Sequence, residues 1–249
     1  MGEAFNPFSL VGRRVLVTGG SSGIGRQIAI HCAKMGAQVV ASGRDESRLK
    51  AVLAELPGTG HSCVAAELTA EADITRLVEE AGVVTGVVHC AGISRLAPIK
   101  MTSIKHLREV EAINFEAPVM LTQRLLSKNS ISPGGSIVFI SSIAAHIGVP
   151  GVGIYSGTKA ALIAMMRCLA MEVVKRKIRA NCLSPALVES PLLDATESLV
   201  GSLDDERRNY PLGFGKPDDV ANAAVFLLSD ASRWITGTTI VMDGGLTVS

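Results

Sequence analysis

Residues 14–25 read RVLVTGGSSGIG, and they set the pattern for the rest of the chain. The first five residues are mostly apolar and β-branched, as in a short buried strand. Four glycines follow, at positions 19, 20, 23 and 25, and a helical stretch then continues to Met35 and ends at Gly36. The stretch therefore predicts a strand, a tight turn and a helix.

The same alternation of strand and helix continues to the C-terminus. Further strands are expected at 38–42, 61–68, 86–90, 136–140, 178–183 and 239–242, and further helices at 45–56, 71–81, 103–127 (bent or restarted near Pro118), 155–175 and 217–228. The strands are apolar on both faces, which is typical of a parallel sheet covered by helices on both sides. We expect an α/β protein with one doubly wound, Rossmann-type parallel sheet of about seven strands. Residues 1–249 form a single domain in this interpretation, and the poorly periodic residues 188–212 form a substrate-binding insert.

Composition and charge exclude several classes of function. Hydrophobic residues make up 47% of the 249 residues and charged residues 19%, so a sizeable core is available. The formal net charge of +1 gives no reason to expect a nucleic acid or an anionic membrane as partner. Five cysteines, an odd number without a C-x-x-C motif, indicate reduced thiols and a cytoplasmic protein. The five histidines are scattered, so no metal site is expected.

The uncharged stretch 136–158 is long enough to cross a membrane, but its glycines and proline argue against a span. No secretory signal peptide is expected either, because residues 1–10 lack a cationic start followed by an apolar run. We interpret 136–158 as a strand, a loop and the start of a helix.

The glycine loop after the first strand has the layout of a phosphate-binding turn. Gly19 allows the tight turn, Gly23 lets the backbone approach a pyrophosphate, and Gly25 lets the helix pack closely on the strand. The free N–H groups and the positive dipole end of the following helix favour an anion. A dinucleotide is therefore the expected ligand, although glycines can also simply end a strand.

The end of the second strand is where a dinucleotide-binding fold contacts the adenosine ribose. Here the residues are Gly43 and Arg44 rather than a carboxylate. The guanidinium of Arg44 suits a 2′-phosphate, which favours NADP over NAD. The alternative is an ordinary solvated arginine.

The stretch from Ser141 to Lys159 contains a serine, Ser142, followed by Tyr155 and Lys159 four residues apart. At that spacing Tyr155 and Lys159 lie on one helical face. An ammonium beside a phenol is expected to lower the pKa of Tyr155 and make it a general acid and base. A chance spacing on an amphipathic helix is the alternative.

With these motifs, the chain resembles the short-chain dehydrogenase/reductase family over residues 10–246. Residues 18–25 match its T-G-x-x-x-G-x-G motif, and residues 90–92 fall where the family has N-N-A-G. Asn114, Ser142, Tyr155 and Lys159 match its catalytic tetrad in order and spacing. The nicotinamide loop after Ser184 and the C-terminal signatures at 235–237 and 243–245 complete the likeness.

The resemblance implies a set of cofactor-binding residues at the carboxyl ends of the strands. They are Gly19, Ser21, Ser22, Gly23, Ile24, Gly25, Arg44, Glu67, Leu68, Cys90, Ala91, Gly92, Tyr155, Lys159, Pro185, Ala186, Val188 and Ser190.

The resemblance also implies roles for the tetrad. Ser142 would polarise the substrate carbonyl, and Tyr155 would donate or accept the proton. Lys159 would bind the ribose hydroxyls and lower the pKa of Tyr155. Asn114 would hold a water that connects Lys159 to solvent. The implied activity is NADP-dependent interconversion of a ketone and a secondary alcohol, with a homotetramer as the implied assembly.

The chain departs from the family pattern in three ways. His89 and Cys90 replace the usual Asn-Asn pair, so the central sheet must be stabilised in another way. Ala186 replaces a glycine in the nicotinamide loop, and Glu67 replaces an aspartate that touches the adenine.

The sequence is compatible with several classes of substrate. Residues 95–101, 146–154 and 188–212 are expected to form the substrate site, and the apolar character of the first two favours an apolar or amphipathic ketone. The chain is most similar to the 3-oxoacyl-carrier-protein reductases. Of two basic residues that dock the carrier protein in that group, only Arg176 is present, because the other position is Pro133. A sugar or polyol dehydrogenase is a third option, and a nucleotide-binding subunit without turnover is the alternative from another class.

Overall fold

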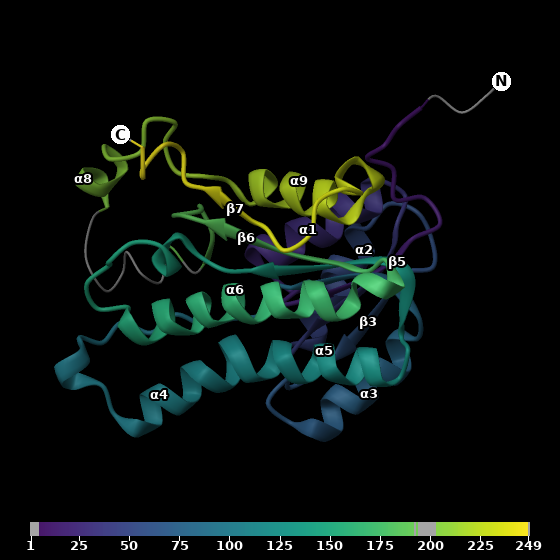
Figure 1. Cartoon of the computed structure of the whole chain (residues 1–249), viewed down its shortest axis with the longest axis horizontal. Coiled ribbons are helices and arrows are strands. Elements are labelled where there is room, and N and C mark those ends of the chain that lie inside the picture. Colours follow the sequence, from purple (N-terminus) through teal and green to yellow (C-terminus); the bar gives the residue numbers. More distant parts are fainter. Residues whose placement is uncertain (1–4, 192, 194–202, 249) are drawn as a thin grey trace.

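Seven parallel strands form one sheet at the centre of the molecule (Figure 1). The structure is a computed structural model, and it describes residues 5–191, 193 and 203–248. The strand order is β3-β2-β1-β4-β5-β6-β7, and every pairing is parallel. The strands are β1 Arg14–Thr18, β2 Gln38–Gly43, β3 Ser62–Ala65, β4 Val84–His89, β5 Ile131–Ile140, β6 Arg179–Pro185 and β7 Thr239–Met242. The predicted α/β class and doubly wound parallel sheet are confirmed.

Helices cover both faces of the sheet (Figure 1). They are α1 Gly23–Lys34, α2 Glu46–Glu55, α3 Glu71–Ala81, α4 Ile104–Glu111, α5 Ala117–Ser127, α6 Gly153–Val173, α8 Asp204–Arg207 and α9 Pro217–Leu228. One layer holds α1, α2 and α9, and the other holds α3, α4, α5 and α6. Short 3₁₀ turns occupy Ile99–Met101 and Ile143–Ala145.

The core is split by the sheet into two apolar clusters. Phe139, Leu121 and Met166 lie in the cluster beneath α3, α5 and α6, and Val15 and Ile28 lie in the cluster beneath α1, α2 and α9. Both clusters draw on alternate residues of the same strands, which is why those strands are apolar on both faces. Two covered faces leave only the ends of the strands for a ligand site.

Several predicted element ends differ from the structure by a few residues, as at β3, which ends at Ala65 and not at 68, and two differences have a clear physical cause. The irregularity in the 103–127 helix is a π turn over Ala112–Glu116, where the N–H of Ala117 donates to the carbonyl of Ala112, and it precedes Pro118. Pro118 lies in the first turn of α5, where a missing N–H is tolerated. Strand β5 begins at Ile131, not at Ser136, because Ile131 pairs with Val84 across an irregular register.

The direction in which the chain winds reverses between β1 and β4. From β1 the chain proceeds outward through β2 and β3, and it then crosses to β4 on the other side of β1. In open parallel sheets such a switch point leaves a crevice at the carboxyl ends of the strands. None of the described helices is long and apolar enough to cross a membrane.

Candidate active site

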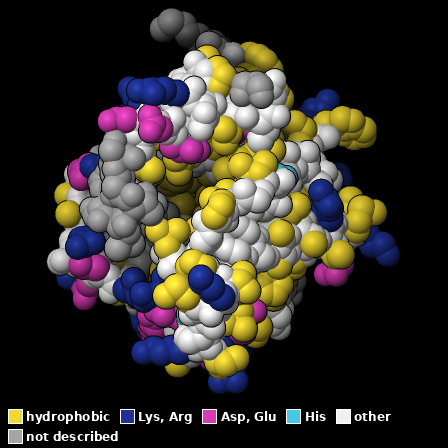
Figure 2. Space-filling view, turned by 90° about the vertical axis from the view of Figure 1, so that its left-hand side faces the viewer, with side chains coloured by type: hydrophobic (Ala, Val, Ile, Leu, Met, Phe, Trp, Pro, Cys, Tyr) yellow, Lys and Arg dark blue, Asp and Glu magenta, His cyan; other side chains and the backbone are white. Residues whose placement is uncertain are grey.

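A cleft of about 600 Å³ opens at the carboxyl ends of the strands. Figure 2 views this end of the molecule and shows a hollow bordered by hydrophobic side chains. Every residue predicted for cofactor binding lines the cleft, from Gly19 in the first loop to Ser190 beyond the sixth strand. Of the predicted catalytic residues, Ser142, Tyr155 and Lys159 line it, and Asn114 lies behind its wall.

The glycine loop runs along the floor of the cleft and joins β1 to α1. Gly19 has a φ of +66°, and a Cβ built there would lie 2.9 Å from the Cα of Ala91. A Cβ at Gly25 would lie 2.2 Å from the carbonyl oxygen of Gly19, so only glycine allows this close approach. Ser22 precedes α1 without a side-chain cap, which leaves N–H groups of the first turn without a side-chain acceptor. These features suit a pyrophosphate.

The residues that replace the Asn-Asn pair are held by two hydroxyl groups. The Oγ1 atom of Thr18 accepts hydrogen bonds from the N–H groups of Cys90 and Ala91, at 3.1 and 3.2 Å. The Nε2 atom of His89 lies 2.9 Å from the hydroxyl of Thr122, and its ring stacks on Phe139 at 4.7 Å between centroids. Burial lowers the pKa of His89 to about 3, so the ring is neutral. These contacts stabilise the ends of β1, β4 and β5 in place of the amides.

Arg44 lies at the end of β2, on the rim of the cleft, and is exposed. Neighbouring cations on α2 are already paired, Arg48 with Asp45 at 3.2 Å and Lys50 with Glu46 at 2.6 Å. No ion pair holds Arg44 within the described residues. Its guanidinium is therefore available to an anionic ligand at this end of the cleft.

Glu67 lines the cleft after β3, which is the neighbouring strand of β2. Its carboxylate accepts from the backbone N–H and the hydroxyl of Thr69, at 3.3 and 3.0 Å. Asp73 holds the N–H of Glu67 at 2.7 Å, so this turn is tied to α3. The glutamate lines the cleft, as an aspartate in this place is expected to do.

Ser142, Tyr155 and Lys159 converge in the middle of the cleft. Ser142 follows β5, and its hydroxyl lies near enough to Tyr155, in the first turns of α6, to lower the pKa of that phenol. The Nζ atom of Lys159 lies 5.6 Å from the centroid of the Tyr155 ring and donates to the carbonyl of Ile140 at 2.8 Å. Ser141 anchors α6 to β5 by donating to the carbonyl of Lys159. A carbonyl oxygen bound at Ser142 and Tyr155 would face two hydroxyl groups.

The pKa of Tyr155 shifts in the direction opposite to the prediction from spacing. Burial raises the pKa of Tyr155, and the hydrogen bond with Ser142 only partly opposes that rise. Burial also lowers the pKa of Lys159 to about 8. The expected lowering by Lys159 fails because both groups are desolvated, and desolvation disfavours phenolate and ammonium alike. The phenol of Tyr155 is therefore protonated at neutral pH in the chain by itself.

Asn114 lies in the π turn and is buried, with 1% of its surface exposed. Its Oδ1 accepts from the N–H of Ile93 at 2.9 Å, and its Nδ2 donates to the carbonyl of Ile93 and to Thr158, at 2.9 and 3.3 Å. Both side-chain N–H bonds are thus used inside the protein. The side chain holds the loop after β4 against α6, behind Gly92 and Lys159.

Ala186 fits the nicotinamide loop without a glycine. Its N–H donates to the carbonyl of Met242 at 2.9 Å, and the described non-glycine residues with positive φ are Asn129 and Lys177 only. Two residues earlier, the hydroxyl of Ser184 lies 3.0 Å from Nε2 of His146. That contact links the loop to the segment that carries Ser142.

The substrate side of the cleft contains residues that the sequence patterns did not single out. Leu96, Ile147, Val149 and Val152 come from the two predicted substrate segments. Glu206, Tyr210 and Leu246 line the same side, and they were missed individually because no motif marks them. Within the 188–212 insert, residues 192 and 194–202 lie outside the described residues. No cluster of three or more metal-ligating side chains occurs in the described ranges.

Comparison with known proteins places these residues in a family context. The model of a family described as enoyl-(acyl carrier protein) reductase matches residues 19–247. A 3-oxoacyl-[acyl-carrier-protein] reductase of Chlamydia pneumoniae is 34% identical, over 96% of this chain and 98% of the relative. D-erythrulose reductase of Gallus gallus is also 34% identical, over 97% and 98% of the two chains.

A solved structure has a similar fold. It is a candidate NAD(P)-dependent gluconate 5-dehydrogenase from Beutenbergia cavernae, with NADP bound at low occupancy. The TM-score is 0.88 and the identity 34%, and the match covers 98% of this chain and 100% of the other.

Proposed function

The chain belongs to the short-chain dehydrogenase/reductase family of oxidoreductases, and from that membership we propose that it interconverts a ketone and a secondary alcohol with NADP as cofactor. The observation that carries the proposal is the convergence of Ser142, Tyr155 and Lys159 in a cleft that begins at a glycine-rich loop. We place the catalytic domain over the whole chain, 1–249, and the substrate-binding insert at 188–212.

When bound, the nicotinamide cofactor supplies or accepts the hydride. Ser142 donates a hydrogen bond to the substrate oxygen and orients it toward Tyr155. Tyr155 gives its proton to that oxygen as the alkoxide forms. Its raised pKa suits this acid role in reduction, and the reverse reaction needs the phenolate.

Lys159 supports both partners of the reaction. One N–H bond is held by the carbonyl of Ile140, which leaves two for the ribose hydroxyls and a water. Its ammonium stabilises the phenolate that remains on Tyr155 after proton transfer. Because the side-chain N–H bonds of Asn114 are occupied, we assign the relay water to a backbone carbonyl of its π turn.

The preference for NADP rests on Arg44. It is an exposed guanidinium without an ion-pair partner among the described residues, and it lies where the adenosine ribose is expected. A guanidinium pairs well with a phosphate, and no carboxylate precedes it on β2 to bind a ribose 2′-hydroxyl.

Two narrower activities are supported by relatives. A 3-oxoacyl-carrier-protein substrate follows from the Chlamydia relative, but the guanidinium of Arg176 donates to the carbonyl of Ile131 and is partly committed to the fold. A sugar or polyol substrate follows from the erythrulose and gluconate enzymes. The apolar wall of the cleft favours a less polar ketone than either sugar.

The test is a screen of NADPH and NADH oxidation over acyl thioesters, cyclic ketones and keto-sugars. We expect NADPH to be oxidised in stoichiometry with the alcohol formed, and apolar ketones to give the largest kcat/KM. Binding of NADPH without oxidation across the whole panel would contradict the proposal and favour a nucleotide-binding subunit without turnover.

We also propose a homotetramer assembled through α4, α5, α6 and β7. Met120 on α5, Met171 on α6 and Val174 directly after α6 are exposed apolar side chains on that side of the molecule. Light scattering should give four times the chain mass of 26.0 kDa. A monomer at micromolar concentration would contradict this assembly. The cytoplasmic location stays a prediction from the cysteine pattern.

A further inference from the structure

The charged side chains of the cleft are unevenly distributed. Those that line it are Arg44, Glu67, Lys159 and Glu206. Arg44 and Glu67 lie at the ends of β2 and β3, where the adenosine end of the cofactor is expected. Lys159 lies beneath Tyr155 and donates to the carbonyl of Ile140. On the substrate side of the cleft, Glu206 is the one charged side chain among the described lining residues.

Glu206 belongs to α8 and is half-buried. Its Oε2 accepts from Nδ2 of Asn209 at 3.3 Å, and no described cation forms an ion pair with it. The neighbouring arginines are engaged elsewhere. Arg207 pairs with Glu189 at 3.2 Å and lies 4.2 Å from the centroid of the Phe214 ring, and Arg208 pairs with Asp205 at 3.1 Å.

The charge of Glu206 acts on the inner wall of the cleft. Burial raises the pKa of Tyr210, and the carboxylates of Glu206 and Asp243 raise that pKa further. Tyr210 is 6% exposed and lines the cleft beside Leu246. The carboxylate of Asp243 is held by Thr247 and the N–H of Gly245. Both carboxylates make the potential on this side negative.

The remaining wall is apolar and offers an anion no compensation. It includes Leu96, Ile147, Val149, Val152, Leu187 and Leu193. A substrate carboxylate would lose its hydration here, and the described residues of the substrate half offer it no cation to pair with.

We propose that Glu206 is a specificity-determining residue that restricts the substrate half of the cleft to uncharged carbonyl compounds and rejects carboxylates. The inference rests on the proposed function, because the cleft must bind a carbonyl substrate next to Tyr155. It narrows the substrate class to neutral ketones. It also separates this chain from an enzyme for sugar acids, such as the gluconate dehydrogenase to which it is structurally similar.

The experiment compares hexanamide with hexanoate, which have the same chain length and differ in charge. Their binding to the enzyme–NADPH complex at pH 7 is followed by the change in NADPH fluorescence. Their competition with a reducible ketone gives the same comparison under turnover. Hexanamide should bind at least about tenfold more tightly than hexanoate, since like charges in a desolvated site repel.

Glu206→Gln should narrow that ratio several-fold, mainly by strengthening hexanoate binding. Asp205→Asn is the matched control, because Asp205 is the preceding residue of α8, its side chain is 93% exposed, and it is not part of the cleft wall. That variant should keep the wild-type ratio. Equal binding of the two ligands in the wild type, or a ratio that Glu206→Gln leaves unchanged, would overturn the inference.

The fluorescence measurement keeps this test separate from the proposed function. Absence of NADPH oxidation with every ketone would refute the proposed reaction, and the binding ratio would still test the role of Glu206. Turnover of neutral ketones together with a preference for hexanoate would refute the role of Glu206 and leave the reaction intact.

Discussion

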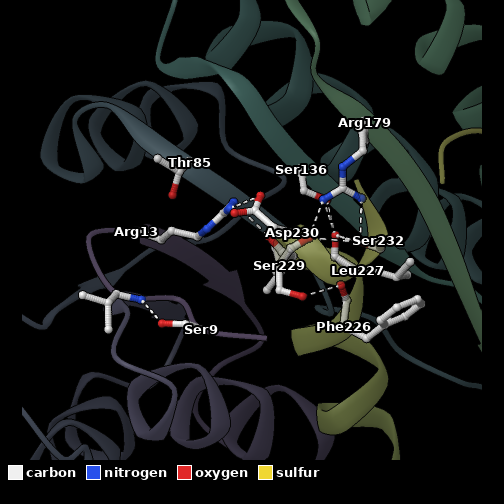
Figure 3. A network of polar contacts seen from close by, with 12 residues as sticks. Ser9, Arg13, Thr85, Ser136, Arg179, Phe226, Leu227, Ser229, Asp230 and Ser232 are labelled. Atoms are coloured by element: carbon white, nitrogen blue, oxygen red, sulfur yellow. Dashed lines mark hydrogen bonds and ion pairs between the residues drawn. The ribbon is translucent and has the colours of Figure 1, made fainter. Parts of the chain in front are cut away.

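At the amino ends of the strands Arg179 is 8% exposed, and at the carboxyl ends Lys159 is 5% exposed. Neither buried cation forms a salt bridge within the described residues. Arg179, the first residue of β6, donates to the carbonyls of Leu227 and Ser229 and to the hydroxyl of Ser232, at 2.8, 3.2 and 2.9 Å (Figure 3). Lys159 makes one such bond, to the carbonyl of Ile140.

The surroundings explain why the two cations differ. Around Arg179, Ser136 also donates to Leu227, and Arg13 donates to Leu228 and pairs with Asp230, so the last carbonyls of α9 are saturated (Figure 3). Burial lowers the pKa of Arg179 to about 10 and that of Lys159 to about 8. The donors of Arg179 are used by the fold. Lys159 uses one of its three N–H bonds for the carbonyl of Ile140, and no described group accepts from the other two, so these are open to a ligand.

The largest effect is expected at Tyr155, beside Lys159. Tyr155→Phe removes the proton donor and should lower kcat by about 10²–10⁴-fold. NADPH binding and the thermal midpoint should change little, because the ring still packs in place. Retention of near-full activity in steady-state assays would refute the assigned acid–base role.

The converse change is Arg179→Met at the other end of the sheet. It leaves the carbonyls of Leu227 and Ser229 without their buried donor and should lower the free energy of unfolding by about 3–5 kcal/mol. The activity per folded molecule should stay within about twofold. Urea titration measures the first quantity and active-site titration the second. Arg13→Met is the control and should cost less, since Asp230, its ion-pair partner, is exposed.

Lys159→Met should raise stability and lower activity, whereas Arg179→Met should lower stability and leave activity nearly unchanged. The pKa of Lys159 falls from 10.5 in its ordinary state to about 8 in the fold. Below pH 8 the buried ammonium destabilises the fold, and between about pH 8 and 10.5 the unfolded chain binds more protons, so stability rises with pH.

The methionine variant lacks that dependence and should be about 1–3 kcal/mol more stable at pH 7 but nearly inactive. Urea titrations of both proteins at pH 7 and pH 9.5 measure the difference between their slopes. An identical pH dependence in the variant would show that Lys159 is not the group responsible.

The smallest of these effects is expected at Arg44, on the rim of the cleft. Arg44→Asp should raise the KM for NADPH about tenfold, change kcat little, and lower the KM for NADH, because a carboxylate can bind the ribose 2′-hydroxyl. Arg48→Ala is the matched control, since Arg48 is paired with Asp45 and does not line the cleft. Equal effects of the two substitutions on NADPH would refute the role of Arg44.

Local patterns predicted most of the fold, and the misses have physical causes. Helix 71–81 and strands 14–18 and 239–242 are found at their predicted bounds, because their periodicity and end residues are local signals. The first half of β5 was missed because Pro133 and two glycines argue against a strand. Pairing of Ile131 with Val84 nevertheless extends it. A tertiary contact there overrides local propensity.

In the candidate site, too, the features encoded locally were predicted and those that depend on tertiary contacts were not. The part of the cleft expected to bind the cofactor is formed by backbone turns, and their glycines can be recognised in the sequence. All residues predicted for cofactor binding line the cleft. The pKa of Tyr155 was predicted in the wrong direction, because spacing along a helix shows a neighbouring charge but not the burial that outweighs it.

The sequence by itself determined the parallel sheet, the glycine loop, and the order and spacing of Asn114, Ser142, Tyr155 and Lys159. It could do so because each of those features is encoded within a short segment. Only the tertiary structure decided whether the pKa of Tyr155 is raised or lowered. It also decided which residues form the substrate side of the cleft, where Glu206 and Tyr210 from the insert meet Leu246 from the C-terminal segment. Desolvation and charge at a site depend on segments far apart in the chain, and no local pattern records which of them meet.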